Sequence, residues 1–269
     1  MTTALIDGDL ILYAACHAVQ ARMYIAYDQE GKPYACSPRK RELDEGATVE
    51  FHTMVDEDSY ASGCEIIDEK LKAIYKATEC TEHTIYLTGR DNFRHEIYDE
   101  YKSHRPEKPI MHKALSLYML DFVDTVMVHG QEADDAMGIA QTDDTIICSY
   151  DKDMLMIPGK HYQFNKDKFI DVTEEEGTRA FYTQLLTGDR VDNIPGLHRV
   201  GPKTAEKMLS ECTTEEEMYE RAYDEYYSRF STEESHAGQV EEDVTSTMLR
   251  NARLLYIRRE EGELWSAPI

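Results

Sequence analysis

The chain has 269 residues, and its hydrophobic content of 41% is enough for a packed core of one large domain or two smaller ones. Its 53 acidic and 29 basic residues give a formal net charge of -24, which argues against loose electrostatic coating of nucleic acid or of an anionic membrane. Asp7 and Asp9 break the apolar start, so neither a signal peptide nor a membrane span is predicted. The six cysteines are scattered singly, which favours reduced thiols in a cytoplasm over zinc sites.

The chain begins with a pattern that alternates between strand and helix. A short apolar segment at 4–6 runs into Asp7-Gly8-Asp9, and residues 10–19 continue with helical spacing of apolar positions. Residues 24–62 read as a hairpin or excursion that carries no chemistry we can name. An amphipathic helix at 65–80 and a short strand at 84–87 then complete a second strand–helix unit.

The same alternation continues through the middle of the chain. Strands are predicted at 123–128 and 145–149, helices at 132–140 and 152–157, and a hairpin at 163–172. Helices at 174–186 and 203–210 follow, and a capping box at 213–216 opens a strongly acidic helix. The pattern predicts an α/β fold with a mixed, mostly parallel sheet flanked by helices and a mainly helical last third.

Acidic residues follow one predicted strand after another. They are Asp7 and Asp9; Glu132, Asp134 and Asp135; Asp151 and Asp153; and later Asp189 and Asp192. Ligands of open α/β sheets gather at the carboxyl ends of strands, where converging carboxylates repel one another unless cations neutralise them. Each residue alone could be a helix cap or a solvated side chain, but together they favour Mg²⁺ or Mn²⁺. Two such ions, roughly 4 Å apart, can activate water and stabilise a leaving oxygen in phosphodiester hydrolysis.

Residues 90–113 concentrate basic and aromatic side chains in an otherwise acidic chain. Arg94, Lys102 and Arg105 could bind phosphates, while Phe93, Tyr98 or Tyr101 could stack on bases. The alternative is a solvated helix that packs Phe93, Ile97 and Tyr101 against the core.

A glycine-rich turn, residues 193–205, joins the acidic pair Asp189 and Asp192 to a helix through Gly196, Gly201 and Pro202. Backbone amides at such a helix entry can bind a phosphate, with Lys203 adding charge. A plain loop with a proline-initiated helix is the competing interpretation.

These residues form a series of motifs that resembles the 5′-to-3′ exonuclease and flap endonuclease family, the PIN-like 5′ nucleases. The short phage-type exonucleases and the 5′-nuclease domain of bacterial DNA polymerase I look most similar. The motifs are I-D-G-D, N-F-R-H-E-I-Y-D-E-Y-K-S-H-R, E-A-D-D, S-Y-D-K-D-M-L, and L-T-G-D-R-V-D-N-I-P-G followed by V-G-P-K-T-A, all within residues 6–205. They stand in the order typical of the family.

The resemblance implies a catalytic PIN-like domain at 1–180, with a helical arch at about 90–113, and a helical domain at 181–269 with a helix-turn-helix-like element. Asp7, Glu132, Asp134 and Asp151 would bind one cation, Asp153, Asp189 and Asp192 the other, and Asp135 would support them. Lys102, Arg94 and Arg105 would act at the scissile phosphate from the arch. Tyr101, Gly201, Lys203 and Thr204 would contact DNA, with K⁺ expected at the helix-turn-helix-like element.

One position departs from the family pattern. Members of the family have an aspartate at the end of the second strand, where this chain has Leu87-Thr88-Gly89. Asp91 could replace that ligand, or it could serve only a local turn.

The resemblance implies a two-metal 5′-to-3′ exonuclease or flap endonuclease that works as a monomer in a cytoplasm, in phage DNA replication or recombination. Its substrates would be DNA with 5′ ends or flaps, and RNA–DNA hybrids are a further candidate. Two rival interpretations are a haloacid-dehalogenase-type phosphatase and a non-catalytic DNA-binding protein. The phosphatase is disfavoured because Gly188-Asp189 to Asp192 is one residue too short for its motif.

Overall fold

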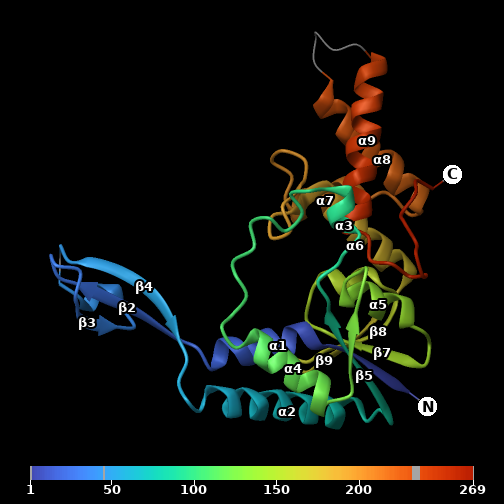
Figure 1. Cartoon of the computed structure of the whole chain (residues 1–269). Helices are drawn as coiled ribbons and strands as arrows, with labels where there is room; N and C mark the ends of the chain where they lie inside the picture. The colour runs from blue at the N-terminus through green and yellow to red at the C-terminus, as the bar shows by residue number, and fades with distance from the viewer. Residues whose placement is uncertain (1, 45, 232–236, 269) are drawn as a thin grey trace. The chain divides into compact units, whose positions relative to one another are not determined.

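The computed structural model describes residues 2–44, 46–231 and 237–268. The chain divides into two compact units, and Figure 1 labels most of their elements. The first unit consists of Met1–Asp7, Ala77–Pro106 and Val126–Ile269, and the second of Gly8–Lys76 and Glu107–Thr125. All but one of the acidic residues singled out in the sequence belong to the first unit; Asp9 belongs to the second.

A six-stranded sheet with the strand order β6-β5-β1-β7-β8-β9 forms the base of the first unit. The strands are β1 (Thr3–Asp7), β5 (Glu82–Thr88), β6 (Thr125–Val128), β7 (Thr145–Cys148), β8 (Gly159–Gln163) and β9 (Lys168–Val172). β1 pairs in parallel with β5 and with β7, β7 pairs in parallel with β8, and only the β8–β9 pair is described as antiparallel. The predicted α/β class with a mostly parallel sheet is confirmed.

The two central strands bring the first candidate ligands to one edge of the sheet. β1 and β7 are buried along nearly their whole length, as the continuous apolar runs of doubly covered strands predict. Ile6 lies opposite Cys148 in the parallel register, so Asp7 and Ser149 follow at the same end. The carboxyl edge of this sheet is therefore where the acidic motifs meet.

Helices and two short strands complete the first unit. They are α3 (Arg94–Ile97), α5 (Ala133–Ala140), the 3₁₀ helix η2 (Asp153–Met156), α6 (Glu174–Thr187), β10 (Gly188–Asp189), β11 (Ile194–Pro195), α7 (Pro202–Leu209), α8 (Glu215–Phe230) and α9 (Ala237–Leu255). α5 packs on β1 and β5, while α6 packs on η2, α7, α8 and α9. The sheet and the helical last third thus share α6 as a common support.

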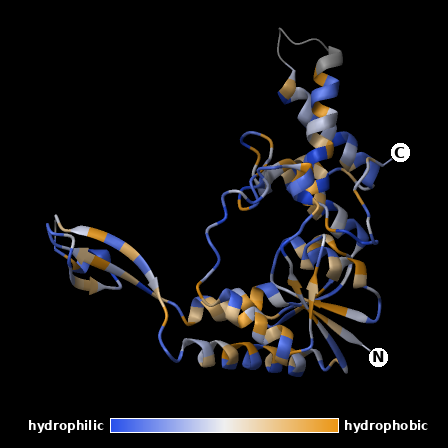
Figure 2. Ribbon diagram, viewed as in Figure 1, coloured by the Kyte–Doolittle hydropathy of each residue, from blue (hydrophilic) through white to orange (hydrophobic). Residues whose placement is uncertain are grey.

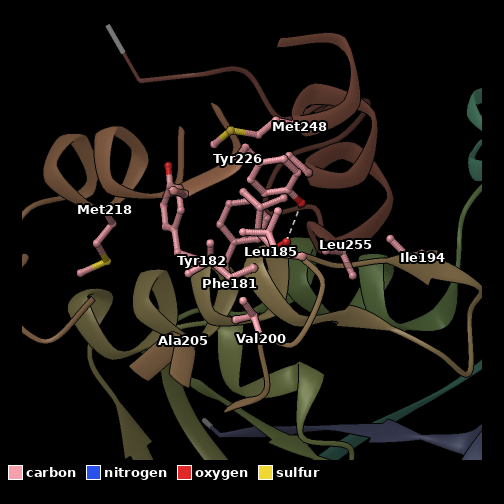
Figure 3. Close-up of a cluster of buried hydrophobic side chains, with 14 of the residues drawn as sticks. Phe181, Tyr182, Leu185, Ile194, Val200, Ala205, Met218, Tyr226, Met248 and Leu255 are labelled. Atoms are coloured by element: carbon pink, nitrogen blue, oxygen red, sulfur yellow. Dashed lines mark hydrogen bonds between the residues drawn. The ribbon is translucent and has the colours of Figure 1, made fainter. Parts of the chain in front are cut away.

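One hydrophobic core runs from η2 through α6 to α8 and α9 (Figure 3). It includes Met156, Phe181 and Tyr226, and the Tyr226 hydroxyl donates a 2.8 Å hydrogen bond to the carbonyl of Leu185. The domain boundary expected between residues 180 and 181 falls inside α6 and inside this core. The two compact units therefore divide the chain differently from the sequence-based boundary.

Capping boxes fix the starts of three helices of the first unit, α5, α6 and α8. The Thr173 hydroxyl accepts from the Glu176 amide at 3.2 Å at the start of α6, and the Glu176 carboxylate accepts from the Thr173 amide at 2.9 Å. α8 begins in the same way with Thr214 and Glu217. The box expected at 213–216 is present, with its glutamate one residue further along.

The segment expected to form a helical arch contains less helix than the family resemblance implies. After the four-residue α3, residues 98–111 form turns and extended chain, and the next helix, α4 (His112–Phe122), belongs to the second unit. Pro106 and Pro109 lack amide hydrogens and disfavour helical conformation in the residues before them, which explains the interruption.

The second unit combines helices with a small antiparallel sheet. Its elements are α1 (Gly8–Ala18), β2 (Ala21–Tyr27), β3 (Pro33–Ser37), the 3₁₀ helix η1 (Lys40–Glu42), β4 (Thr48–Met54), α2 (Ser59–Thr78) and α4. The sheet has the order β3-β2-β4, so the predicted hairpin gains a third strand. Figure 2 shows hydrophobic and hydrophilic residues recurring along α2, as the predicted amphipathic helix requires. None of the described helices is long and apolar enough to cross a membrane.

Candidate active site

Three parts of the chain place carboxylates near the carboxyl edge of the large sheet, and a fourth carboxylate comes from the separate two-stranded sheet. Asp7 is the last residue of β1, Glu132 is the N-cap of α5, Asp151 follows β7, and Asp189 lies on β10. The Asp7 carboxylate accepts a 2.8 Å hydrogen bond from the Ser149 hydroxyl, which links the ends of β1 and β7. The sequence pattern predicted Asp7 and Asp151 at strand ends and Glu132 at a helix start, as the structure has them, whereas Asp189 lies on the short strand β10.

The first group of carboxylates crowds around Asp134. Burial raises the pKa of Asp134 well above its usual range, and the negative charges of Asp7, Glu132 and Asp151 raise it further. Lys102 acts in the opposite direction. The four carboxylates expected to share one cation therefore lie close enough to repel one another.

The second group surrounds the turn between β10 and β11. The Asp189 carboxylate accepts from the amide of Val191 at 2.7 Å and from that of Asp192 at 3.3 Å. Burial, and next the charge of Asp151, raise the pKa of Asp153, against the effect of the Lys152 ammonium 3.0 Å away. Asp153 thus stands beside both groups.

Both groups face one small cavity of about 30 Å³. Glu132 and Asp134 line it from the first group, and Asp153, Asp189 and Asp192 line it from the second. Members of both ligand sets that the family resemblance implies therefore line one cavity of the first unit, whereas Asp7 and Asp151 are not among its lining residues.

Lys102 and Arg105 lie against these carboxylates. The Lys102 ammonium bonds to the Glu132 carboxylate and is 3.7 Å from the Asp192 carboxylate, while the Arg105 guanidinium contacts Asp192 at 2.5 Å. The Lys102 amide also donates to the Asp192 carbonyl at 3.0 Å. Lys102 has a left-handed φ of 58°, a conformation that costs energy for a non-glycine residue and is often found at functional sites.

The donor set fits hard divalent cations, because it consists of carboxylate oxygens whose mutual repulsion a cation would relieve. Within the described residues, however, no three carboxylate, imidazole or thiolate groups are already arranged as a metal site. Glu132 and Asp192 are turned toward Lys102 and Arg105 instead. Binding of cations at this place would therefore require these two basic side chains to move.

The expectation that Arg94 contacts a phosphate from an exposed arch is wrong for its position in this structure. Its side chain is 2% exposed and forms two hydrogen bonds with Asp135, at 2.6 and 2.9 Å. The motif identified the residue, but the surrounding helices bury it. Arg94 still lines the cavity, whereas its partner Asp135, at 0% exposure, does not.

Tyr101 is also buried, at 2% exposure, so it cannot stack on a base from this position. Its hydroxyl contacts the Glu132 carboxylate at 3.1 Å and the Asp192 carboxylate at 3.2 Å. Burial, and next the charge of Glu132, raise the pKa of its phenol. The residue joins the two carboxylate groups rather than presenting a ring to the surface.

Asp91 does not join the cluster. Its side chain is 61% exposed and accepts from the Gly130 amide at 2.8 Å, with the His129 ring at 3.0 Å. Asp91 is not among the residues that line the cavity. Its contacts fit the alternative that Asp91 serves only a local turn.

The glycine turn leads into α7 as expected. Gly201 is the N-cap of α7, Pro202 is its first residue, and Lys203 and Thr204 are exposed in its first turn. Backbone amides at this helix start could face a phosphate.

Gln184 is a cavity residue that the sequence analysis missed. It is 7% exposed, and its amide donates to the Asp189 carboxylate at 3.3 Å. It also hydrogen-bonds to Asp153. The only sequence signal for Gln184 was its position five residues before Asp189. That signal is weak, because a glutamine on a predicted helix follows no distinctive pattern.

No protein-family model matches the chain, but known proteins are similar to parts of it. DNA polymerase I of Rhizobium leguminosarum is 35% identical over a region covering 51% of this chain and 16% of the polymerase. A 5′-3′ exonuclease of Buchnera aphidicola (subspecies Acyrthosiphon pisum) is 27% identical, over 50% of this chain and 54% of that protein. The matches therefore span about half of this chain and well under two thirds of either relative.

Solved structures show the same fold over nearly the whole chain. The T5 D15 protein co-crystallised with metal ions superposes with a TM-score of 0.60 and 14% identity, covering 95% of this chain and 89% of that one. The T5 5′-exonuclease with bound zinc gives a TM-score of 0.55 and 16% identity, covering 94% and 88%. The chain is thus a homologue of proteins named 5′-3′ exonuclease and DNA polymerase I, and it has the fold of the T5 5′-exonuclease.

Proposed function

We propose that the chain is a 5′-to-3′ exonuclease and flap endonuclease that hydrolyses DNA phosphodiester bonds with two divalent cations. The observation that carries this proposal is the convergence of five carboxylates on one cavity, with Lys102 and Arg105 beside them. The relative named 5′-3′ exonuclease supports it, as does the T5 D15 flap endonuclease solved in complex with DNA and metal ions.

Asp7, Glu132, Asp134 and Asp151 would hold one cation, and Asp153, Asp189 and Asp192 the other. Bound Mg²⁺ or Mn²⁺ would supply an activated water and offset the charge on the leaving 3′ oxygen.

The chain's own basic residues would act on the phosphate. Lys102 and Arg105 would leave the carboxylates once cations bind and donate to oxygens of the scissile phosphate, where negative charge grows during the reaction. Tyr101 would keep Glu132 and Asp192 oriented through its hydroxyl.

Binding of the duplex would use a different surface. Gly201, Lys203 and Thr204 at the start of α7 would contact the phosphate backbone, where the exposed Lys203 adds positive charge. A K⁺ ion held near this turn, and action as a monomer in phage DNA replication or recombination, belong to the same proposal.

Cleavage assays on end-labelled DNA test the proposal. Flap and nicked duplex substrates should be cut from the 5′ side in Mg²⁺ or Mn²⁺, and an RNA–DNA hybrid tests whether RNA is a substrate too. Excess chelator should abolish cleavage, because without the cations nothing would offset the charge of the crowded carboxylates or of the leaving oxygen. Release of phosphate from small monoesters without DNA cleavage would support the phosphatase, and DNA binding without cleavage would support the non-catalytic protein.

A further inference from the structure

A buried ion pair lies against the carboxylates of the candidate active site, and its arginine lines the cavity. Arg94 and Asp135, at 2% and 0% exposure, form a bidentate pair with distances of 2.6 and 2.9 Å. A buried ion pair is by itself weak evidence for stability, because burial removes the hydration of both charges. Its location therefore calls for a role beyond holding the core together.

The pair receives its remaining hydrogen bonds from the chain at the end of α9. The Arg94 Nε donates to the Leu254 carbonyl at 2.8 Å, and its Nη2 donates to the Tyr256 carbonyl at 2.8 Å. The Arg258 amide donates to the Asp135 carboxylate at 3.1 Å. Residues 254–258, which we call the α9 exit, thus satisfy both members of the pair.

The same pair reaches forward to the cavity. The Asp135 Oδ2 accepts from the Glu132 amide at 3.1 Å in the capping box of α5, and the Arg94 Nη1 is 3.9 Å from the Glu132 carboxylate. Asp134 lies between Glu132 and Asp135 in the sequence and lines the cavity. Three residues of the α9 exit, Leu254, Leu255 and Ile257, line the same cavity.

The pair therefore connects the start of α5 with residues from the far end of the sequence. We propose that Arg94 and Asp135 are positioning residues through which the α9 exit holds Glu132 and Asp134 in place for the cations. This inference rests on the proposed function, because it takes these two carboxylates to be cation ligands. It gives Arg94 no contact with DNA and assigns residues 254–258 to the construction of the active site.

Arg94→Lys is the variant that tests the proposal. Lysine keeps the positive charge but cannot form the bidentate contact and reach two carbonyls at once. The readout is the Mn²⁺ dissociation constant without DNA, measured by calorimetry below the unfolding temperature of each protein. Loss of residues that orient metal ligands typically weakens metal binding about 10–100-fold, so a loss of at least about tenfold is expected.

Arg179→Lys is the matched control. Arg179 also donates to two carbonyls, those of Leu209 at 2.6 Å and Cys212 at 2.7 Å, and it pairs with Glu175 at 2.9 Å. It lies in the same unit and is absent from the cavity lining. This variant should lose stability but keep the Mn²⁺ affinity of the wild type.

A milder variant covers the case in which Arg94→Lys fails to fold. Arg258→Ala keeps the amide that bonds to Asp135 but removes a guanidinium that contacts Gln131 at 2.9 Å and lies 3.8 Å from the centre of the Phe93 ring. It should weaken Mn²⁺ binding in the same direction, by a smaller factor.

The outcomes separate this inference from the proposed function. Weaker Mn²⁺ binding in Arg94→Lys or Arg258→Ala, with Arg179→Lys unchanged, supports the positioning pair. Wild-type affinity in folded Arg94→Lys, or an equal loss in the Arg179 control, overturns it while leaving the cation site intact. A wild-type protein that binds no Mn²⁺ overturns the proposed function as well.

Discussion

Asp134 shows how crowded the charges of the candidate site are. Its folded pKa is raised, first by burial and then by the neighbouring carboxylates. When the pKa of an acid is higher in the folded than in the unfolded protein, the folded state resists ionisation of that acid. The protein therefore loses stability as the pH rises from the unfolded pKa through the folded pKa. Without cations, ionisation of this side chain therefore opposes folding.

Asp134→Asn should consequently raise the unfolding temperature in chelator at neutral pH, since asparagine carries no charge. The same change should lower Mg²⁺-dependent cleavage by orders of magnitude, because a cation ligand is lost. Thermal unfolding and single-turnover cleavage measure the two effects, and the exposed Asp143→Asn is the control that should change neither. A less stable Asp134→Asn protein in chelator would contradict the charge-crowding account.

Lys102 and Lys203 should have separable effects on DNA. Lys102→Met should reduce the single-turnover rate by about 10²-fold or more while duplex affinity changes little, because it acts where charge develops. Lys203→Met should mainly weaken binding and reduce its salt dependence by about one ion. Anisotropy titrations at several salt concentrations, together with single-turnover rates, check this pair. Identical profiles for both variants would mean that the two lysines share one role.

The sequence predicted which residues belong to the site better than it predicted where their side chains point. Strand ends and motifs located the carboxylates, because chain connectivity alone brings them to one edge of the sheet. The directions of Arg94 and Tyr101 depend on contacts with residues far along the chain, such as Leu254 and Asp192, which no local pattern contains. For Tyr101, the alternative of packing against the core was the correct one.

At the scale of elements, α5 and the α9 exit are packed closely together. A Cβ added at Gly138 on α5 would lie 2.4 Å from the carbonyl oxygen of Arg258, and backbone cannot easily move away. Glycine is therefore needed here by the approach of another segment, even though alanine is the better helix former.

Gly138→Ala should destabilise the protein, because overpacking costs about 1–3 kcal/mol whereas the gain in helix propensity is about 1 kcal/mol. The unfolding temperature should fall, and Mn²⁺ affinity should fall with it if the displaced α9 exit disturbs Glu132. Gly63→Ala on α2 is a comparison in which the added Cβ meets only the flexible side chain of Leu115, at 2.7 Å. A Gly138→Ala protein more stable than the wild type would show that the two elements are not in close contact.

The elements themselves were largely predictable, since periodicity and capping residues are local. The family resemblance overstated the helix content of the arch, although the two prolines in that segment are a local signal against helix. The division of the chain into two compact units could not be predicted from local sequence patterns. It depends on the packing of α6 on α7, α8 and α9, which places residues on both sides of the expected domain boundary in one core.

For the whole molecule, the net charge of -24 means that DNA must approach an acidic protein. The cavity carboxylates repel phosphates, and bound cations reverse the sign of the local charge. Binding of DNA and cleavage of DNA should therefore respond differently to removal of one carboxylate.

The most direct test of the proposed nuclease uses Asp151→Asn, which removes one charge from the first group with little change in volume. Flap binding is measured by anisotropy in chelator, and single-turnover cleavage in Mg²⁺, for the variant and the wild type. We expect cleavage to fall by orders of magnitude, while binding is kept or tightens because the variant repels phosphate less. Normal cleavage by the variant, or loss of binding and cleavage together in a folded protein, would contradict the assignment of these carboxylates to the cation site.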